Sequence, residues 1–143
     1  MAVITLAADS TTLTLNGHVF TSFMTGDLFT LTPANPHSAH VNSQAGGVSI
    51  QRRSDGNVYD LPVRIQKFSD DDIFLNSALA GDKVVIFNGS AKENFNKNGV
   101  DGVETYLLEN GSITTQPTNA KNDQDGNALM EYTLRFRSVS RAL

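Results

Sequence analysis

The stretch Leu129-Met-Glu-Tyr-Thr-Leu-Arg-Phe-Arg-Ser-Val139 decides the fold class, because its side chains alternate between apolar and polar. A period of two residues is typical of a β-strand with one buried face. The same alternation runs through residues 57–67, where Pro62 falls on the polar face and favours an edge or a bulge. In residues 129–139, one face of the strand would carry the apolar side chains of Met130, Tyr132, Leu134 and Phe136, and the other face the polar side chains of Glu131, Thr133, Arg135 and Arg137.

Shorter segments with strand character fill most of the remaining chain. Asn16-Gly17, Gly26-Asp27 and Asn98-Gly99 mark tight turns between them. Asp55-Gly56-Asn57 predicts a hairpin that joins residues 47–53 to residues 57–67, and Asn110-Gly111 predicts a bulge or a break. The expected short strands are residues 2–7, 11–16, 18–24, 27–32, 47–53, 83–95 and 102–116.

One segment breaks the strand pattern and predicts a helix of about ten residues that ends near Gly81. Ser69 is a good N-cap, and Asp72 resembles the acid of a capping box. The run Asp70-Asp71-Asp72 is explained by the positive end of the helix dipole. Ile73, Leu79 and Ala80 would share the buried stripe. The predicted fold is therefore all-β with one short helix, a two-sheet β-sandwich or β-barrel.

Length and composition limit the classes of function. The chain has 143 residues, enough for the single domain we expect over residues 1–143. It has no cysteine, which excludes disulfides and thiolate metal sites, and its formal net charge is −4, so it has no overall basic footprint for nucleic acid. It shows no secretory signal and no stretch of about 20 apolar residues that would predict a membrane span.

No set of residues predicts catalysis, a metal or a cofactor. His37-x-x-His40 lies in a proline-containing loop and lacks a third ligand. The Asx-rich segments at Asn94–Asn98 and Asp123–Asp125 depart from a calcium loop at the ligand positions and are interpreted as turns. Arg52-Arg53 and the pair Arg135 and Arg137 are the densest basic spots; they suit a solvated strand face or acids of a neighbouring chain. We expect a protein that is not an enzyme.

Six segments, taken in order, resemble the tail tube proteins of contractile-tailed bacteriophages. Their order and spacing carry the resemblance, which covers residues 11–140 and is more specific before Gly81 than after it. The segments are Thr14-Leu-Asn-Gly-His18, Gly26-Asp-Leu-Phe-Thr-Leu-Thr-Pro33, Asn35-Pro-His-Ser-Ala-His-Val-Asn42, Gly46-Gly-Val-Ser-Ile-Gln-Arg-Arg-Ser-Asp-Gly56, Asp60-Leu-Pro-Val-Arg-Ile-Gln-Lys-Phe-Ser-Asp-Asp-Asp72 and Phe74-Leu-Asn76.

The resemblance implies a structural protein of the virion, assembled in the bacterial cytoplasm. Six copies would form a ring, and stacked rings would form the inner tube, with four strands of each copy lining the lumen. The tail sheath would lie outside, the baseplate and the tail terminator at the ends, and DNA would pass without specific binding. A related ring component (tube initiator, terminator or baseplate protein) is the alternative. A small β-sandwich binding module is a further one, although the chain has no Trp and only three Tyr.

Two groups of residues follow as candidate sites. Two long loops are expected, at residues 32–46 and 117–128, and the first would contact an adjacent ring or subunit. The residues of that loop are Asn35, Pro36, His37, His40, Val41 and Asn42. Polar residues on strands with one apolar face would line the lumen; these are Thr30, Thr32, Ser49, Gln51, Asp60, Arg64 and Gln66.

Overall fold

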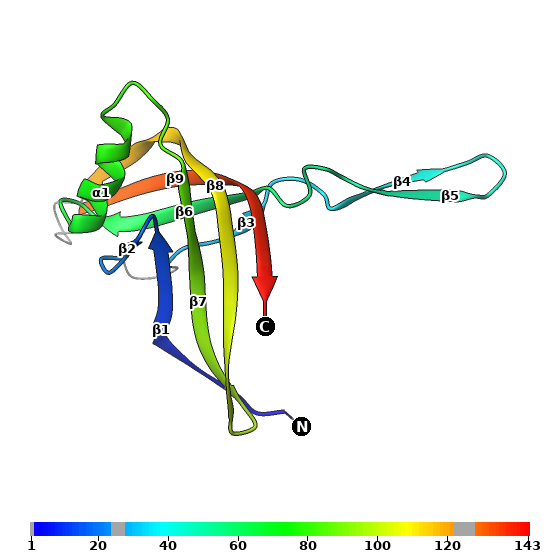
Figure 1. The fold of residues 1–143 in the computed structure, drawn as a ribbon, viewed down its shortest axis with the longest axis horizontal. Coiled ribbons are helices and arrows are strands. Elements are labelled where there is room, and N and C mark those ends of the chain that lie inside the picture. Colours follow the sequence, from blue (N-terminus) through cyan, green and yellow to red (C-terminus); the bar gives the residue numbers. More distant parts are fainter. Residues whose placement is uncertain (1, 24–27, 122–127) are drawn as a thin grey trace.

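Strands make up most of the chain in the computed structural model, which describes residues 2–23, 28–121 and 128–143. The all-β fold with one short helix is confirmed for these residues (Figure 1). The alternating stretch at residues 129–139 lies in the last strand. The elements are β1 (Ile4–Leu15), β2 (His18–Val19), β3 (Thr32–Pro33), β4 (Ser38–Asn42), β5 (Val48–Arg52), β6 (Tyr59–Gln66), α1 (Asp70–Leu79), β7 (Phe87–Lys97), β8 (Val100–Lys121) and β9 (Ala128–Ala142).

The described strands form one large sheet and a separate hairpin. The order in the large sheet is β2-β1-β7-β8-β9-β6-β3, with antiparallel pairing throughout, whereas β4 and β5 pair only with each other. The large sheet bends along its longest strands, so that β6 and the start of β9 run across the direction of β1 and β7 (Figure 1). The bend produces the two layers that enclose the core.

β8 and β9 belong to both layers. β8 pairs with β7 as far as Gly111 and from Ser112 onward only with β9, while β9 pairs with β6 only as far as Phe136. We call β1, β7 and the adjoining parts of β8 and β9 the β1 layer. The β6 layer consists of β3, β6 and the other parts of β8 and β9.

A bulge marks the bend in β8, as Asn110-Gly111 predicted. Phe87 faces Gly111 and Gly89 faces Leu108, so β8 has one residue more than β7 across this interval. Asn110 has a φ of 54°, a conformation that asparagine tolerates better than most residues. Gly111 leaves room for a core ring, because a Cβ there would lie 2.8 Å from Cζ of Phe136. The two residues therefore allow a single strand to serve both layers.

The core lies between the layers and beneath α1. Tyr132, Leu134 and Phe136 of β9 and Leu61, Val63 and Ile65 of β6 are fully buried, as the alternation predicted. The cluster of buried apolar side chains consists of Leu13, Leu15, Phe20, Leu61, Val63, Ile65, Leu75, Phe87, Ala91, Leu108, Tyr132, Leu134, Phe136 and Val139.

The helix begins as predicted but buries other side chains. The Ser69 side chain caps it by accepting a hydrogen bond from the Asp72 N–H, at 3.3 Å. The predicted stripe is wrong at Ile73, which is 62% exposed, whereas Leu75 is fully buried. Gly81 follows the C-cap residue Ala80, and its φ is not positive, so it does not form the left-handed cap that its position suggested.

Two of the three helix-start acids are buried and bind the rest of the fold. Asp72 accepts hydrogen bonds from the Phe68 N–H at 2.9 Å and from the Tyr132 hydroxyl at 2.7 Å. In a capping box it would reach the N–H of Ser69 instead. Asp71 is fully buried and accepts hydrogen bonds from three groups of the segment after β1. The helix dipole therefore explains only part of why these acids are here, because Asp71 and Asp72 also bind side chains and backbone groups outside the helix.

Replacing Tyr132 with Phe should lower the free energy of unfolding by about 1–3 kcal/mol, because the Asp72 carboxylate loses the hydrogen bond that the buried Tyr132 hydroxyl donates. Burial and, next, the hydrogen bond to Asp72 raise the pKa of Tyr132 well above its ordinary 10.0. The unfolded chain therefore ionises first as the pH rises above about 10, which lowers the stability of the wild type. Urea unfolding of both proteins at pH 7 and pH 11 should show a smaller difference at the higher pH. An unchanged difference would contradict this assignment.

The prediction for residues 32–67 was wrong in its pairing. Residues 38–42, expected within a long loop, form β4 and pair with β5, from Ser38 opposite Arg52 to Asn42 opposite Val48. Residues 57–67 do not pair with residues 47–53; β6 pairs with β9 and β3. The turn residues at 54–57 link the hairpin to β6 instead. Sequence alternation shows which faces are apolar, but not which strand lies alongside.

Smaller differences concern the ends of strands. In the segments expected as strands at 18–24 and 27–32, the described residues 18–23 and 28–32 contribute β2, the first residue of β3 and single bridges from Phe23 to Ile65 and from Phe29 to Val63. Pro62 lies near the edge of the sheet, as its residue type predicted, because within the described residues β6 is followed at that edge by the two-residue strand β3 and these two bridges alone. The described residues of the loop expected at 117–128 belong to strands: β8 continues to Lys121 and β9 begins at Ala128. The Gly26-Asp27 turn and the Asp123–Asp125 motif lie outside the described residues.

Candidate assembly surfaces

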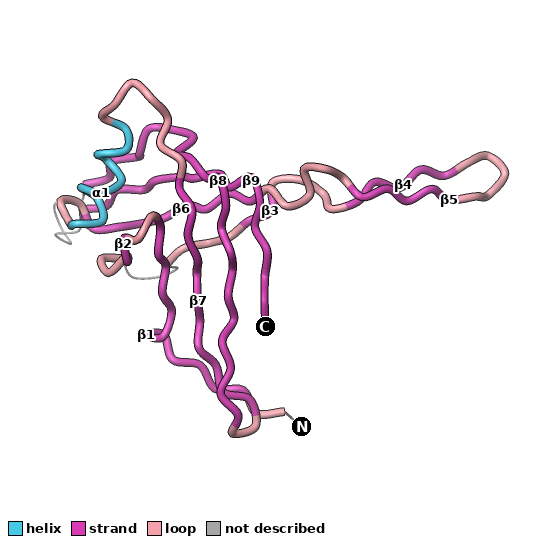
Figure 2. The backbone as a smooth tube through the Cα atoms, in the orientation of Figure 1, coloured by secondary structure: helices cyan, strands magenta, loops and turns pink. Residues whose placement is uncertain are grey.

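The β4–β5 hairpin extends away from both layers (Figure 2). Val41, Val48 and Ile50 are each at least 60% exposed, so neither face of the hairpin is covered by its own chain. A two-stranded hairpin alone is marginally stable in water. The hairpin therefore has the properties of an element that becomes ordered against another surface.

The six residues predicted to contact a neighbour all belong to this hairpin or to its base. His40, Val41 and Asn42 lie on β4. Asn35 donates a hydrogen bond to the Asp55 carbonyl at 3.3 Å, and the His37 carbonyl accepts one from the Arg53 N–H at 2.9 Å. Pro36 is exposed between them. Their contact with a neighbouring copy stays a prediction. Their description as loop residues was wrong for His40, Val41 and Asn42, which belong to a strand.

The residues predicted to line a lumen lie in separate places. Thr32 pairs with Asp60, and Arg64 and Gln66 follow Asp60 at intervals of two along β6, so all four share the outer face of the β6 layer. Thr30 is exposed just before β3. Ser49 and Gln51 are on the hairpin and not on the large sheet, so the expected common sheet is wrong for these two.

Opposite charges face each other on the outer face of the β6 layer. Arg135 Nε donates a hydrogen bond to Asp60 Oδ1 at 2.7 Å, and this bond raises the pKa of the guanidinium group. Arg64 lies directly opposite Glu131. Arg137, expected as part of a basic pair, donates to the Ser54 carbonyl at 3.3 Å. Arg135 therefore has an acidic partner within its own chain.

The far end of the β1 layer extends beyond the β6 layer and the helix (Figure 1). This overhang consists of Ile4–Leu6 of β1 with residues 93–97 of β7 and 100–104 of β8. Leu6 is opposite Phe95, and Phe95 is opposite Gly102. Ile4, Leu6 and Val100 are 59–70% exposed. The overhang therefore exposes an apolar surface that sequence analysis did not single out, although its apolar residues recur at intervals of two.

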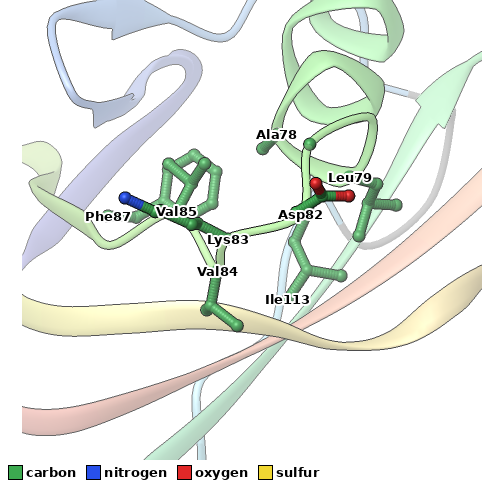
Figure 3. Close-up of a pocket in the computed structure, with 9 residues that line it drawn as sticks. Ala78, Leu79, Asp82, Lys83, Val84, Val85, Phe87 and Ile113 are labelled. Carbon is green, nitrogen blue, oxygen red and sulfur yellow. The ribbon is translucent and has the colours of Figure 1, made fainter.

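A small groove lies between the end of α1 and the start of β7 (Figure 3). Its volume is about 140 Å³, and Leu79, Val84 and Ile113 border it from the helix, the following loop and β8. Asp82 and Lys83 lie at its loop side. This lining supports apolar contact.

The described residues include no group of three or more His, Cys, Asp or Glu placed to hold a metal ion. His40 lies 3.4 Å from the Ser38 hydroxyl. Among these residues, no helix is long and apolar enough to cross a membrane.

The fold resembles that of a chain in a solved assembly. That chain belongs to the cryo-EM structure of the anti-feeding prophage baseplate, in its sixfold-symmetrised form. The two share 10% sequence identity with a TM-score of 0.52, over 92% of this chain and 90% of the other. No protein-family model matches the sequence, and no curated protein matches it either. At this identity, the comparison shows a common fold.

Proposed function

We propose that this protein is a structural, non-enzymatic subunit of a contractile phage tail or a related particle, and that copies of it form the rings of the inner tube. The observation that carries the proposal is the fold, shared along nearly the whole chain with a chain of a sixfold-symmetrised baseplate. The sheath would lie outside these rings, and baseplate and terminator proteins at their ends. The particle would then be the site where the protein acts.

The open edge of the β6 layer supports assembly through strand pairing. From Ser112 to Lys121, β8 has β9 on one side and no strand on the other within the described residues. The opposite end of the layer is the two-residue strand β3. Unpaired strand edges are templates for another chain, and closing a sheet into a barrel removes them. A head-to-tail contact that closes would give a ring.

The outer face of the β6 layer has the properties of a wall around a water-filled channel. The exposed large apolar residues of the described chain lie elsewhere; Val19, Val103 and Leu107, for example, lie on the outer face of the β1 layer. Arg135 and Arg64 face acids, which limits the free cations available to phosphates. We therefore propose Thr32, Asp60, Arg64 and Gln66 as lumen residues and assign the β1 layer to contacts with other proteins.

The same fold similarity also fits a ring that does not stack. Since the solved structure is a baseplate, a tube initiator, terminator or baseplate ring is the second candidate. Negative-stain microscopy of the purified protein separates the two. Long hollow tubes indicate the tube subunit, whereas single rings indicate the second candidate. A compact single unit at high concentration contradicts both.

Lysines on the open edge should block ring formation without unfolding the subunit. Thr115 and Thr118 are exposed on the part of β8 that has β9 on one side and no strand on the other within the described residues. Lysine on such an edge strand disfavours pairing with another chain. We expect the double variant Thr115→Lys/Thr118→Lys to stay dispersed in microscopy and to keep the wild-type thermal transition. The matched control is Ser140→Lys/Ala142→Lys, at exposed positions of β9 in the β1 layer, and should assemble. Normal rings from the edge variant would exclude this edge.

A further inference from the structure

The inner face of the overhang lacks the second layer that covers the rest of its sheet. Ala91 of β7 is buried in the core, and the register with β8 is regular from Gly89 to Lys97. Residues 93, 95 and 97 therefore face the same way as Ala91 but lie beyond the core. The Phe95 ring lies over Gly102, where a Cβ would come within 2.8 Å of a ring carbon. This face therefore combines an uncovered apolar group, Ile4, Leu6, Phe95 and Val100, with charged residues at its ends.

The hairpin has a matching face. Because residues directly opposite each other share a face, Val48, Ile50 and Arg52 lie on the same side as His40. Val48 and Ile50 are 60% and 65% exposed. Within one chain the hairpin extends sideways from the β6 layer and does not lie over the overhang, so we consider another copy as the surface that it covers (Figure 1).

We propose that the β4–β5 hairpin of one copy packs through Val48 and Ile50 against Leu6 and Phe95 on the inner face of another copy's overhang. The inference rests on the proposed self-assembly and names the two surfaces that meet. The hairpin supplies in trans the missing second layer of a sandwich, which packs face to face at a spacing of about 10 Å.

The two surfaces agree in length. Each hairpin strand has five residues, and the overhang comprises five residues of β7 and five of β8. At about 3.3 Å per residue, both surfaces are about 17 Å long. The two strands of the hairpin can therefore cover Leu6 and Phe95, which lie opposite each other on the adjacent strands β1 and β7.

Their charges also complement each other. Residues 34–53 contain Arg52 and Arg53 but no acid. Glu93 and Glu104 lie on the inner face of the overhang together with Lys97, and Glu104 binds Arg141. Arg52 and Glu93 make no ion pair within the described residues. Docking would give each of them an opposite charge at the rim, where such charges favour register more than affinity.

Cross-linking can test the contact directly, because the chain has no cysteine of its own. Ile50→Cys and Leu6→Cys proteins are prepared separately, mixed, allowed to assemble and treated with a short bismaleimide. We expect at least about 10-fold more mixed dimer than in a control mixture of Ile50→Cys with Ile73→Cys, since docking raises the effective thiol concentration. Ile73 is as exposed as Leu6 but lies on the helix. If Leu6→Cys prevents assembly, Val100→Cys replaces it.

The outcomes separate this inference from the proposed function. If the protein forms rings or tubes and the Ile50→Cys and Leu6→Cys mixture cross-links more than the control, the result supports both the hairpin contact and the proposed function. Rings or tubes whose cross-linking does not exceed the control overturn the hairpin contact and leave the proposed function standing. Failure of the unmodified wild-type protein to form rings or tubes overturns the proposed function, and the inference with it.

Discussion

Replacing Asp71 with Ala should lower the free energy of unfolding by about 3–5 kcal/mol, because it removes a fully buried carboxylate that is the acceptor of three part-buried donors. Asp71 is fully buried. One carboxylate oxygen accepts from His18 Nε2 at 2.7 Å, and the other accepts from the backbone N–H groups of Thr21 and Ser22 at 3.0 and 2.7 Å. The side chain therefore holds the helix to the segment that follows β1. Urea unfolding followed by circular dichroism measures the loss.

Asp70→Ala is the matched control for this prediction. Asp70 precedes Asp71 in the same helix turn but is exposed. Its loss removes only a favourable charge at the helix start, worth at most about 1 kcal/mol. If the two variants unfold at the same urea concentration, the three contacts of Asp71 do not support the fold as described.

Replacing Gly89 with Ala should destabilise the protein by about 3 kcal/mol or more, or prevent folding. Gly89 lies opposite Leu15 where β7 meets the end of β1. A Cβ there would overlap the Thr14 carbonyl and come within 2.9 Å of Leu15 Cα. These are backbone atoms, so β1 would have to move away from β7 and the adjacent core would be distorted. At the size of this protein, that loss would lower the melting temperature by about 10 °C.

Gly81→Ala provides the comparison for the same chemical change. Its φ is not positive, and the nearest atom to an added Cβ is 4.0 Å away. It should be neutral or raise stability by up to about 1 kcal/mol, because it restricts only the unfolded chain. Equal melting temperatures for the two variants would show that β1 and β7 do not approach each other this closely.

Sequence analysis was most successful where the deciding interaction is local. The alternation in β6 and β9 identifies the buried side chains, since it follows from strand geometry alone. Ser69 caps the helix through a bond to the third following residue. Asn110-Gly111 marks a bulge through its own backbone preferences.

Features that depend on distant partners could not be predicted in this way. The carboxylates of Asp71 and Asp72 suited a helix start, and nothing local showed that His18 and Tyr132 bind them. Residues 47–53 were predicted to pair with residues 57–67, because their alternation is the same whichever strand lies beside them. The overhang was missed because an exposed apolar strand face and a buried one have the same pattern.

The continuity of β8 and β9 through both layers has a mechanical consequence. A load applied to one layer passes to the other along covalent backbone, and not across side-chain contacts that slide. Moving the layers apart would require straightening both strands at the bend. In the proposed ring, a subunit built in this way would pass an axial force from neighbour to neighbour as one rigid body.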